Sequence, residues 1–144
     1  MRKMIALCVV LAACSARGAE DKDVISNQVG DWDGSLSQVG NSGVRGSAKA
    51  QSVGVGTGVN VSIQGAQSGA QHPWHVHSGV CGDNGAIVGN AGAYPVLTVA
   101  TDGTASANAT IDVALKEDQS YYVNVHRSPT DLGTIVACGR IAND

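Results

Sequence analysis

Short runs in which apolar and polar residues alternate recur along most of the chain, and glycines separate them. In Val59–Gln64 (VNVSIQ), for example, every second residue is apolar. A period of two places alternate side chains on opposite faces of a strand, whereas an amphipathic helix needs a period near 3.6. The chain also has 19 glycines and no phenylalanine, and it is rich in valine, alanine, threonine and serine. This pattern predicts an all-β protein with a core of small side chains.

At 144 residues the chain is long enough for one domain with a single core, and we expect that domain to start near Trp32. About eight short strands are expected, with no helix longer than one turn. Those with clear patterns are 44–51, 59–64, 74–77, 97–100, 104–111, 121–126 and 134–141. Asp102-Gly103 predicts a hairpin between two of these strands, and the composition of residues 127–133 is typical of a loop.

The first residues have the plan of a secretory signal peptide. A basic start, Met1-Arg2-Lys3, precedes an apolar run over 4–13 that is too short for a membrane span, which needs about 20 residues. Leu11-Ala12-Ala13-Cys14 then resembles the bacterial lipobox, in which the cysteine becomes the lipidated first residue. We expect a lipoprotein signal peptide over 1–13, a lipidated tether over 14–31 and the domain over 32–144. The alternative is an ordinary signal peptide cleaved near residues 16–19, and both predict export.

The charge and the anchor limit the partners. Without residues 1–13 the chain has seven Lys plus Arg against twelve Asp plus Glu, a formal charge of −5 that gives no indication of nucleic-acid binding. Membrane contact is expected through the lipid on Cys14 only. Ser15 follows Cys14 in place of an aspartate that would retain the protein at the inner membrane. We therefore expect a lipid-anchored protein of the bacterial cell envelope, in the periplasm at the outer membrane.

Two of the four cysteines are expected to pair. Cys8 leaves with the signal peptide and Cys14 carries lipid, so Cys81 and Cys138 remain in an oxidising compartment and are predicted to form a disulfide. In the chain-entropy model, closing a loop of about 58 residues stabilises the fold by about 4 kcal/mol.

The histidines are the candidate metal ligands. His72, His75 and His77 lie within six residues of one another, although the chain has only four histidines. On a strand, His75 and His77 project from the same face while Val76 points into the core. His126 ends another alternating strand and projects outward in the same way. If the two strands are neighbours, three imidazole nitrogens converge, an arrangement that suits copper or zinc above nickel and iron. The alternative is a set of surface histidines without a role.

The run His72–His77, with Cys81 four residues later, resembles the copper-zinc superoxide dismutase family. That family has an H-x-x-H-x-H run and a cysteine that pairs with a second one in a C-terminal Ala-Cys-Gly, which is Ala137-Cys138-Gly139 here. Residues 123–133 are similar to the family's strand with the third copper histidine and the loop after it. Residues 93–115 follow its central hairpin. The resemblance covers about residues 32–141.

The resemblance implies a flattened Greek-key β-barrel, an immunoglobulin-like sandwich. It implies that His75, His77 and His126 bind one copper ion. His72 matches the family's histidine that is not a ligand and that bonds to the backbone beneath the site. The Cys81–Cys138 disulfide would connect a loop to the last strand.

The chain also departs from the family. Its interval 82–92 contains no histidine, so no zinc site of the family's kind and no bridging histidine are expected. The arginine that guides superoxide is replaced by Ile135, with Arg127 and Arg140 as the candidate substitutes. The candidates for a further oxygen ligand are Asp83, Asn84 and Asp131.

Three functions fit these residues. The first is a superoxide dismutase-like oxidoreductase that converts superoxide to oxygen and hydrogen peroxide at a three-histidine copper site. The second is a periplasmic protein that binds or hands on copper without turnover. The third is a barrel with relic histidines that binds a protein or wall component. Activity is expected to be below that of a complete family member, because electrostatic steering can raise association 10-fold to about 1000-fold. No catalytic residue is assigned beyond the metal ligands.

Overall fold

The computed structural model describes residues 30–143, which form nine β-strands and one turn of 3-10 helix. The strands are β1 (Asp31–Gln38), β2 (Arg45–Val53), β3 (Gly56–Gln64), β4 (Gln71–His72), β5 (Trp74–Ser78), β6 (Leu97–Thr98), β7 (Ala105–Ile111), β8 (Tyr121–Ser128) and β9 (Asp131–Asn143), with the helical turn η1 (Ala91–Ala93) before β6. The predicted all-β class is confirmed. Among the described residues no helix has the length and hydropathy needed to cross a membrane.

Most of the N-terminal region for which the sequence makes predictions lies before residue 30, where the description begins. The predicted signal peptide, the lipidated Cys14 and the tether up to residue 29 lie outside the described residues. Strand β1 begins at Asp31, which was expected to be the last residue of the tether, so the fold begins one residue before the expected start of the domain.

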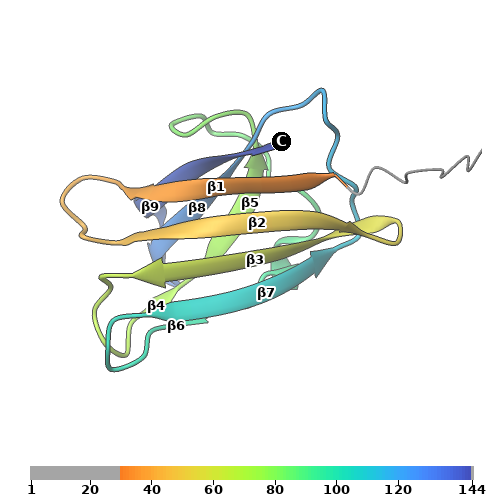
Figure 1. Cartoon of the computed structure of the whole chain (residues 1–144). Coiled ribbons are helices and arrows are strands. Elements are labelled where there is room, and N and C mark those ends of the chain that lie inside the picture. The colour runs from red at the N-terminus through yellow and green to blue at the C-terminus, as the bar shows by residue number, and fades with distance from the viewer. Residues whose placement is uncertain (1–29, 144) are drawn as a thin grey trace, which may run out of the picture.

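Seven strands form one curled antiparallel sheet in the order β5-β8-β9-β1-β2-β3-β7, and β4 pairs with β6 in a small second sheet. Figure 1 shows β1, β2, β3 and β7 in one layer, with β5, β8 and β9 behind them. Strands β1 and β9 approach closely where the sheet bends. A Cβ atom on Gly34 would collide with the carbonyl of Arg140, and one on Gly139 would collide with the carbonyl of Ser35. The two glycines therefore permit this close packing.

The core lies between the two layers. The predicted alternation is visible in β3, where Val59, Val61 and Ile63 are buried and the residues between them are partly exposed. Many core side chains are small, as expected, but the five aromatic residues of the chain are all buried as well: Trp32, Trp74, Tyr94, Tyr121 and Tyr122. All of these rings except that of Tyr122 belong to the hydrophobic core, where they fill volume that valine and alanine leave open.

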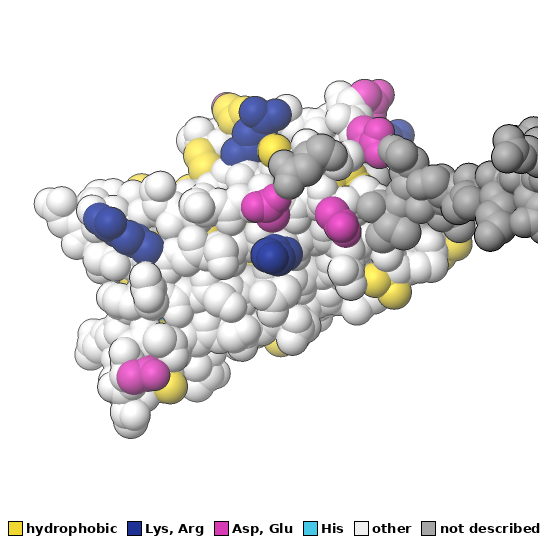
Figure 2. Space-filling view, in the orientation of Figure 1, with side chains coloured by type: hydrophobic (Ala, Val, Ile, Leu, Met, Phe, Trp, Pro, Cys, Tyr) yellow, Lys and Arg dark blue, Asp and Glu magenta, His cyan; other side chains and the backbone are white. Residues whose placement is uncertain are grey.

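The outer face of β1, β2, β3 and β7 is polar. Register places Ser35, Ser47, Ser62 and Ser106 in one row across the four strands. Figure 2 shows this face with few charges, few apolar side chains and no visible histidine. The candidate ligands are therefore carried by the other part of the sheet, around β5 and β8.

Two local predictions differ from the structure. Residues 127–133 are not a long loop, because β8 continues to Ser128 and β9 begins at Asp131. The Asp131 carboxylate accepts a hydrogen bond from the Thr134 N–H (3.1 Å), which stabilises this tight connection. The turn at residues 101–103 forms, with the Ala100 N–H donating to the Thr104 carbonyl (2.8 Å). Its flanking strands separate, however, since β6 pairs with β4 and β7 pairs with β3.

Candidate metal centre

Two neighbouring strands carry the three histidines. Strand β5 contributes His75 and His77, and β8, its antiparallel partner, contributes His126. Val76 is fully buried in the core, so the histidines on either side of it project from the opposite face, as the period of two predicts. This face is not open to solvent, since each of the three histidines is at most 8% exposed. The outward projection inferred from the alternation is therefore right in direction, but it does not make the rings accessible.

The chain after the disulfide loop shields this edge of the sheet. The Ser78 N–H donates to the Ala86 carbonyl (3.0 Å), and the Val88 N–H donates to the Val76 carbonyl (2.9 Å). Residues 86–88 therefore run along the outer edge of β5 like a short extra strand. This segment, from the interval that contains no histidine, thus pairs with the edge of β5 next to His77.

A register shift in β8 helps to aim His126. The shift lies between Val125 and His126, and the His126 N–H donates to the Pro73 carbonyl (2.8 Å). Such irregularities re-aim a side chain relative to a regular ladder. The His126 Nε2 atom lies 3.1 Å from the Nδ1 atom of His75. One ring nitrogen from each of the three histidines lies within 4.8 Å of the others, so the expected convergence is present.

Backbone carbonyls orient two of the rings. The Nδ1–H of His77 donates to the Gly85 carbonyl (2.8 Å), and the Nδ1–H of His126 donates to the Leu132 carbonyl (2.7 Å). Outer partners of this kind fix the ring orientation and leave Nε2 free to act as a ligand. The Nε2 atom of His77 is buried and has no hydrogen-bond partner. An unpartnered buried nitrogen is costly, and because His77 belongs to the three converging histidines, this atom fits a role as a metal ligand; the Nε2 atom of His72 is also buried and unpartnered, but His72 lies outside that group.

If the third ring, that of His75, binds a metal through Nδ1, its tautomer must change. With the His126 proton on Nδ1, the 3.1 Å contact requires His75 to donate from its own Nδ1 to His126 Nε2. A metal between these two nitrogens would replace that hydrogen bond, and the remaining proton of His75 would then lie on Nε2. The site can therefore exist without a metal and exchange one internal hydrogen bond for two ligand bonds.

The surroundings favour neutral rings. The pKa of His75 is lowered to about 4, first by burial and then by the charges of His126 and His77. Burial also lowers the pKa of His126, although the Leu132 carbonyl opposes the shift. Since a metal binds the deprotonated nitrogen, both rings are in the form required near pH 7.

The lowered pKa of His75 predicts how stability depends on pH. An unfolded histidine titrates near pH 6.5, so between about pH 6.5 and 4 the unfolded metal-free chain binds more protons than the folded chain. Stability should be full above about pH 6.5 and should fall as the pH drops to 4, by about 3 kcal/mol from this group. Denaturant unfolding with a chelator present measures the loss. A His75→Asn variant, which lacks the titrating ring, should lose clearly less, and an equal loss in both proteins would contradict the assignment.

His72 lies beneath the site and outside the group of three. It is buried, and its Nδ1–H donates to the His126 carbonyl (2.9 Å). This contact ties β4 to the strand that carries the third candidate ligand. The geometry matches the backbone-bonding role that the family resemblance implies for His72.

The candidate oxygen ligands do not join the histidines. Among the described residues, the one group of three or more His, Cys, Asp or Glu side chains with converging ligand atoms is the histidine trio. The Asp83 carboxylate accepts from the Val80 N–H (3.1 Å), and Asp131 forms an ion pair with Arg127 (3.6 Å). Asn84 borders the pocket beside the histidines but makes no side-chain hydrogen bond among those found in residues 30–143. Arg140 is exposed on β9, opposite Tyr122 in register.

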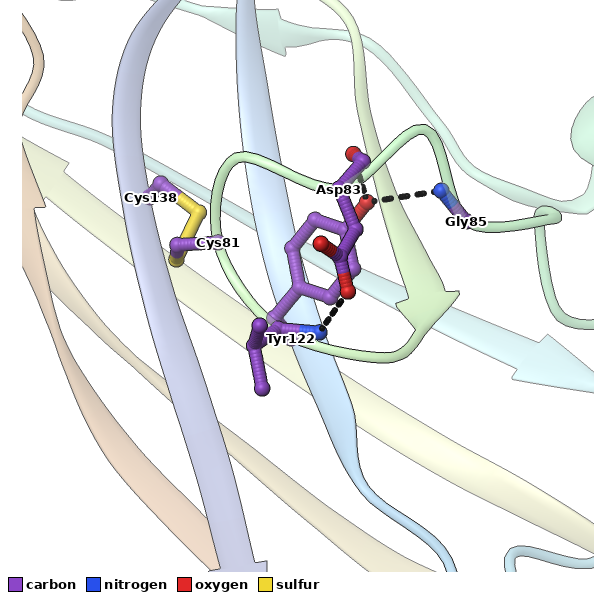
Figure 3. The surroundings of a disulfide bond; sticks show 6 residues. Cys81, Asp83, Gly85, Tyr122 and Cys138 are labelled. Atoms are coloured by element: carbon purple, nitrogen blue, oxygen red, sulfur yellow. Dashed lines mark hydrogen bonds between the residues drawn. A yellow bond between two sulfur atoms is a disulfide. The ribbon is translucent and has the colours of Figure 1, made fainter.

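The predicted disulfide is present between Cys81 and Cys138, with 57 residues of sequence separation. It joins the loop after β5 to β9. Cys138 lies opposite Asn124 in register, and Asn124 lies opposite His75. Strand β8, which carries His126, therefore lies between Cys138 on β9 and His75 on β5. Figure 3 shows the disulfide beside the loop that contains Asp83 and Gly85.

A pocket of about 600 Å³ opens beside His77 and His126. Its apolar lining includes Val39, Ile87, Leu132 and Ile135. Asp83 is the one Asp, Glu, Lys or Arg among its lining residues, so no cationic side chain lines it. Ile135, which stands where the family resemblance predicts the guiding arginine, therefore contributes apolar surface to the approach.

Several residues around the histidines were not predicted from the sequence. The carbonyls of Gly85 and Leu132 orient two rings, the ring of Tyr94 packs edge-on against His75 (5.2 Å), and Tyr122 stacks on His77 (5.2 Å). Backbone carbonyls carry no residue-type signal. The one available signal was Tyr122, which shares the outward face of its strand with His126 and is too apolar for a solvent-exposed position.

Gly85 offers a test of the outer partners. A Cβ atom at this position would collide with the Ser78 carbonyl, so Gly85→Ala should displace the carbonyl that holds His77. We expect metal affinity to fall about 10- to 100-fold although all three histidines remain. A competition titration with a chelator measures the change. Gly92→Ala is the matched control and should bind metal as the unmodified protein does. Gly92 lies in an exposed turn, and the one atom that an added Cβ would approach is Asn90 Oδ1, at 3.3 Å. Equal affinities for all three proteins would contradict the role of the carbonyl.

No protein-family model matches this chain, and no curated protein matches it. The grounds for a function are therefore the geometry and chemistry of the site. The described residues form an all-β protein with a buried group of three histidines that could hold a metal ion.

Proposed function

We propose that this protein binds one copper ion through His75, His77 and His126 and that it belongs to the superoxide dismutase type, without that type's zinc site. The observation that carries the proposal is the convergence of three buried histidines, one ring nitrogen from each lying within 4.8 Å of the others, and the buried Nε2 atom of His77, without a hydrogen-bond partner, adds to it. Three imidazoles suit copper, and zinc is the competing ion. The pairing of β9 with β1, which curls the sheet, supports the further proposal of a Greek-key barrel.

We infer that the activity is the disproportionation of superoxide, in which two superoxide anions and two protons give O₂ and H₂O₂. Copper supplies a metal that alternates between two oxidation states, which this one-electron chemistry requires. The three histidines hold the ion through neutral nitrogens, and no further His, Cys, Asp or Glu side chain of the described residues converges with them. The pocket lined by His77 and His126 supports this proposal, because it lies next to two of the three candidate ligands.

A second candidate is copper binding and transfer without turnover. The observation in its favour is the lining of the pocket, which has no cationic side chain to attract an anion. Arg127 forms an ion pair with Asp131 (3.6 Å), which offsets its charge, and it does not line the pocket. Steering of superoxide would therefore be weak, whereas uptake of a copper ion would not be opposed by positive charge.

One experiment separates these functions. The purified protein is loaded with copper, and the bound metal and the rate of superoxide consumption are measured together. One equivalent of copper, with turnover that His77→Ala abolishes, supports the enzyme. One tightly bound equivalent without turnover supports the copper-handling protein. If neither copper nor zinc binds, both proposals fail, and the histidines are relics in a barrel with another binding function.

We also propose that the protein is exported and anchored in the bacterial cell envelope by lipid on Cys14. The sequence Leu11-Ala12-Ala13-Cys14 and the apolar run before it support this proposal. In cells, a Cys14→Ala variant should move from the membrane fraction to the soluble fraction and should no longer incorporate a labelled fatty acid. An unchanged distribution would contradict the anchor.

A further inference from the structure

Tyr122 lies directly opposite His77 across the β5–β8 ladder. Its side chain is fully buried, and its ring stacks on the His77 ring with a centroid distance of 5.2 Å and an interplanar angle of 20°. We propose that Tyr122 is a positioning residue that holds His77 in its metal-binding orientation, an inference that rests on the proposed copper site.

The tyrosine hydroxyl closes a ring of contacts around His77. It donates to the Asp83 carbonyl (2.6 Å) and accepts from the Gly85 N–H (3.2 Å), as Figure 3 shows. The Gly85 carbonyl in turn accepts from the Nδ1–H of His77 (2.8 Å). Tyr122 therefore contacts His77 twice, directly through the stacked rings and indirectly through the loop that carries the carbonyl acceptor.

These contacts matter because the orientation of His77 leaves one of its nitrogens unsatisfied. The Nε2 atom is buried without a partner, which is unfavourable, so this orientation needs other contacts to stabilise it. The stacked ring of Tyr122 packs on one face of the imidazole, and the Gly85 carbonyl accepts its Nδ1–H. A site held in the geometry needed for binding loses less free energy when the ligand binds.

The other two histidines are held by different groups. His126 donates to the Leu132 carbonyl, and His75 contacts the ring of Tyr94 and the nitrogen of His126. The loss of Tyr122 should therefore affect one ligand of the three. The disulfide at Cys81 anchors the beginning of the same loop, and the tyrosine hydroxyl anchors its middle.

Tyr121, the preceding residue, provides a matched control. It is also buried, and its hydroxyl also has two partners, since it donates to Gln119 Oε1 (3.0 Å) and accepts from the Lys116 N–H (3.0 Å). Its ring, however, lies in the hydrophobic core on the opposite face of β8. Tyr121→Phe and Tyr122→Phe thus remove the same atoms and comparable hydrogen bonds, but only the second change alters the loop that holds His77.

The test uses copper(II) as the probe, with the full chain and three variants, Tyr121→Phe, Tyr122→Phe and Tyr122→Leu. A competing chelator gives the affinity, and electron paramagnetic resonance gives the copper spectrum. We expect the affinity to fall about 10-fold in Tyr122→Phe and up to about 100-fold in Tyr122→Leu, with an altered spectrum in both. Tyr121→Phe should keep the affinity and the spectrum of the unmodified protein, whatever it loses in thermal stability.

A second measurement needs no metal. In the metal-free protein, nuclear magnetic resonance should detect the Nδ1–H proton of His77 in slow exchange with water, because it is buried and bonded to Gly85. Tyr122→Phe should speed this exchange and Tyr121→Phe should not. If both phenylalanine variants match the unmodified protein in spectrum and exchange, the positioning role is wrong. If the unmodified protein binds no copper, the proposed function fails, and the exchange measurement alone decides the role of Tyr122.

Discussion

Replacement of His126 by alanine is expected to lower the affinity for copper by at least about 100-fold, because the loss of an outer partner alone costs about 10- to 100-fold and a ligand contributes more. The two candidate ligands that remain, His75 and His77, lie on one strand. The variant lacks the Nε2 atom of His126, which lies 3.1 Å from His75 Nδ1 in the unmodified protein. Their shared face cannot supply a third imidazole. A competition titration in the presence of a chelator measures the affinity, and superoxide consumption should fall with it.

His72 supplies the control for this prediction. It is buried like the three ligands but faces the His126 carbonyl, with Nδ1 as the donor. His72→Asn retains an N–H donor near the position of Nδ1, so this variant should still bind one equivalent of copper with near-normal affinity. Wild-type affinity in His126→Ala would show that the metal is bound elsewhere. Equal losses in the two variants would mean that both act through the fold.

Loss of the Cys81–Cys138 disulfide is expected to destabilise the metal-free protein by about 4 kcal/mol, because the bond closes a long loop in the unfolded chain. The double variant Cys81→Ser/Cys138→Ser removes the bond without leaving one thiol unpaired. Denaturant unfolding with a chelator present gives the free energy and excludes any contribution from bound metal. A loss of this size is a large fraction of the stability of a typical domain, which is about 5–15 kcal/mol.

A reducing agent provides the matching control for the disulfide. It should lower the stability of the unmodified protein to that of the double serine variant, and it should leave the variant unchanged. If the reducing agent destabilises both proteins equally, or if the two proteins are equally stable without it, the disulfide does not contribute as the loop length predicts.

The alternation of side chains in the sequence locates most of the strands. Val59–Gln64 and Ala105–Ile111 are strands, because each buries one face against the core and exposes the other. The connection at residues 127–133 was misjudged, because its polar and small residues are also compatible with the ends of two paired strands. The composition of this segment indicates that its backbone is exposed to solvent. It does not indicate that Ser128 pairs with Asp131, because this pairing depends on the position of β9 beside β8.

For the candidate site, sequence reasoning identified all three histidines but not the groups that hold them. His75 and His77 share a face in any strand, so their proximity follows from local geometry. His126 joins them only because β8 is the neighbour of β5 and a register shift turns its side chain. Tyr122 and the carbonyl of Gly85 were missed, because a stacked ring and a carbonyl acceptor are defined by position and not by a motif.

The sequence by itself determined the strand class, the pairing of the two cysteines and the same-face pair of histidines, because these follow from a two-residue period and from the number of cysteines left if residues 1–14 are those of an exported lipoprotein, as proposed. The tertiary structure decided that the histidine face is buried, that His77 Nε2 has no partner and that the pocket beside it lacks a cationic side chain. These properties depend on contacts between residues far apart in the sequence, such as His75 and His126, which are 51 positions apart. No local pattern specifies such contacts, since the packing of strands and loops creates them only when the whole sheet has formed.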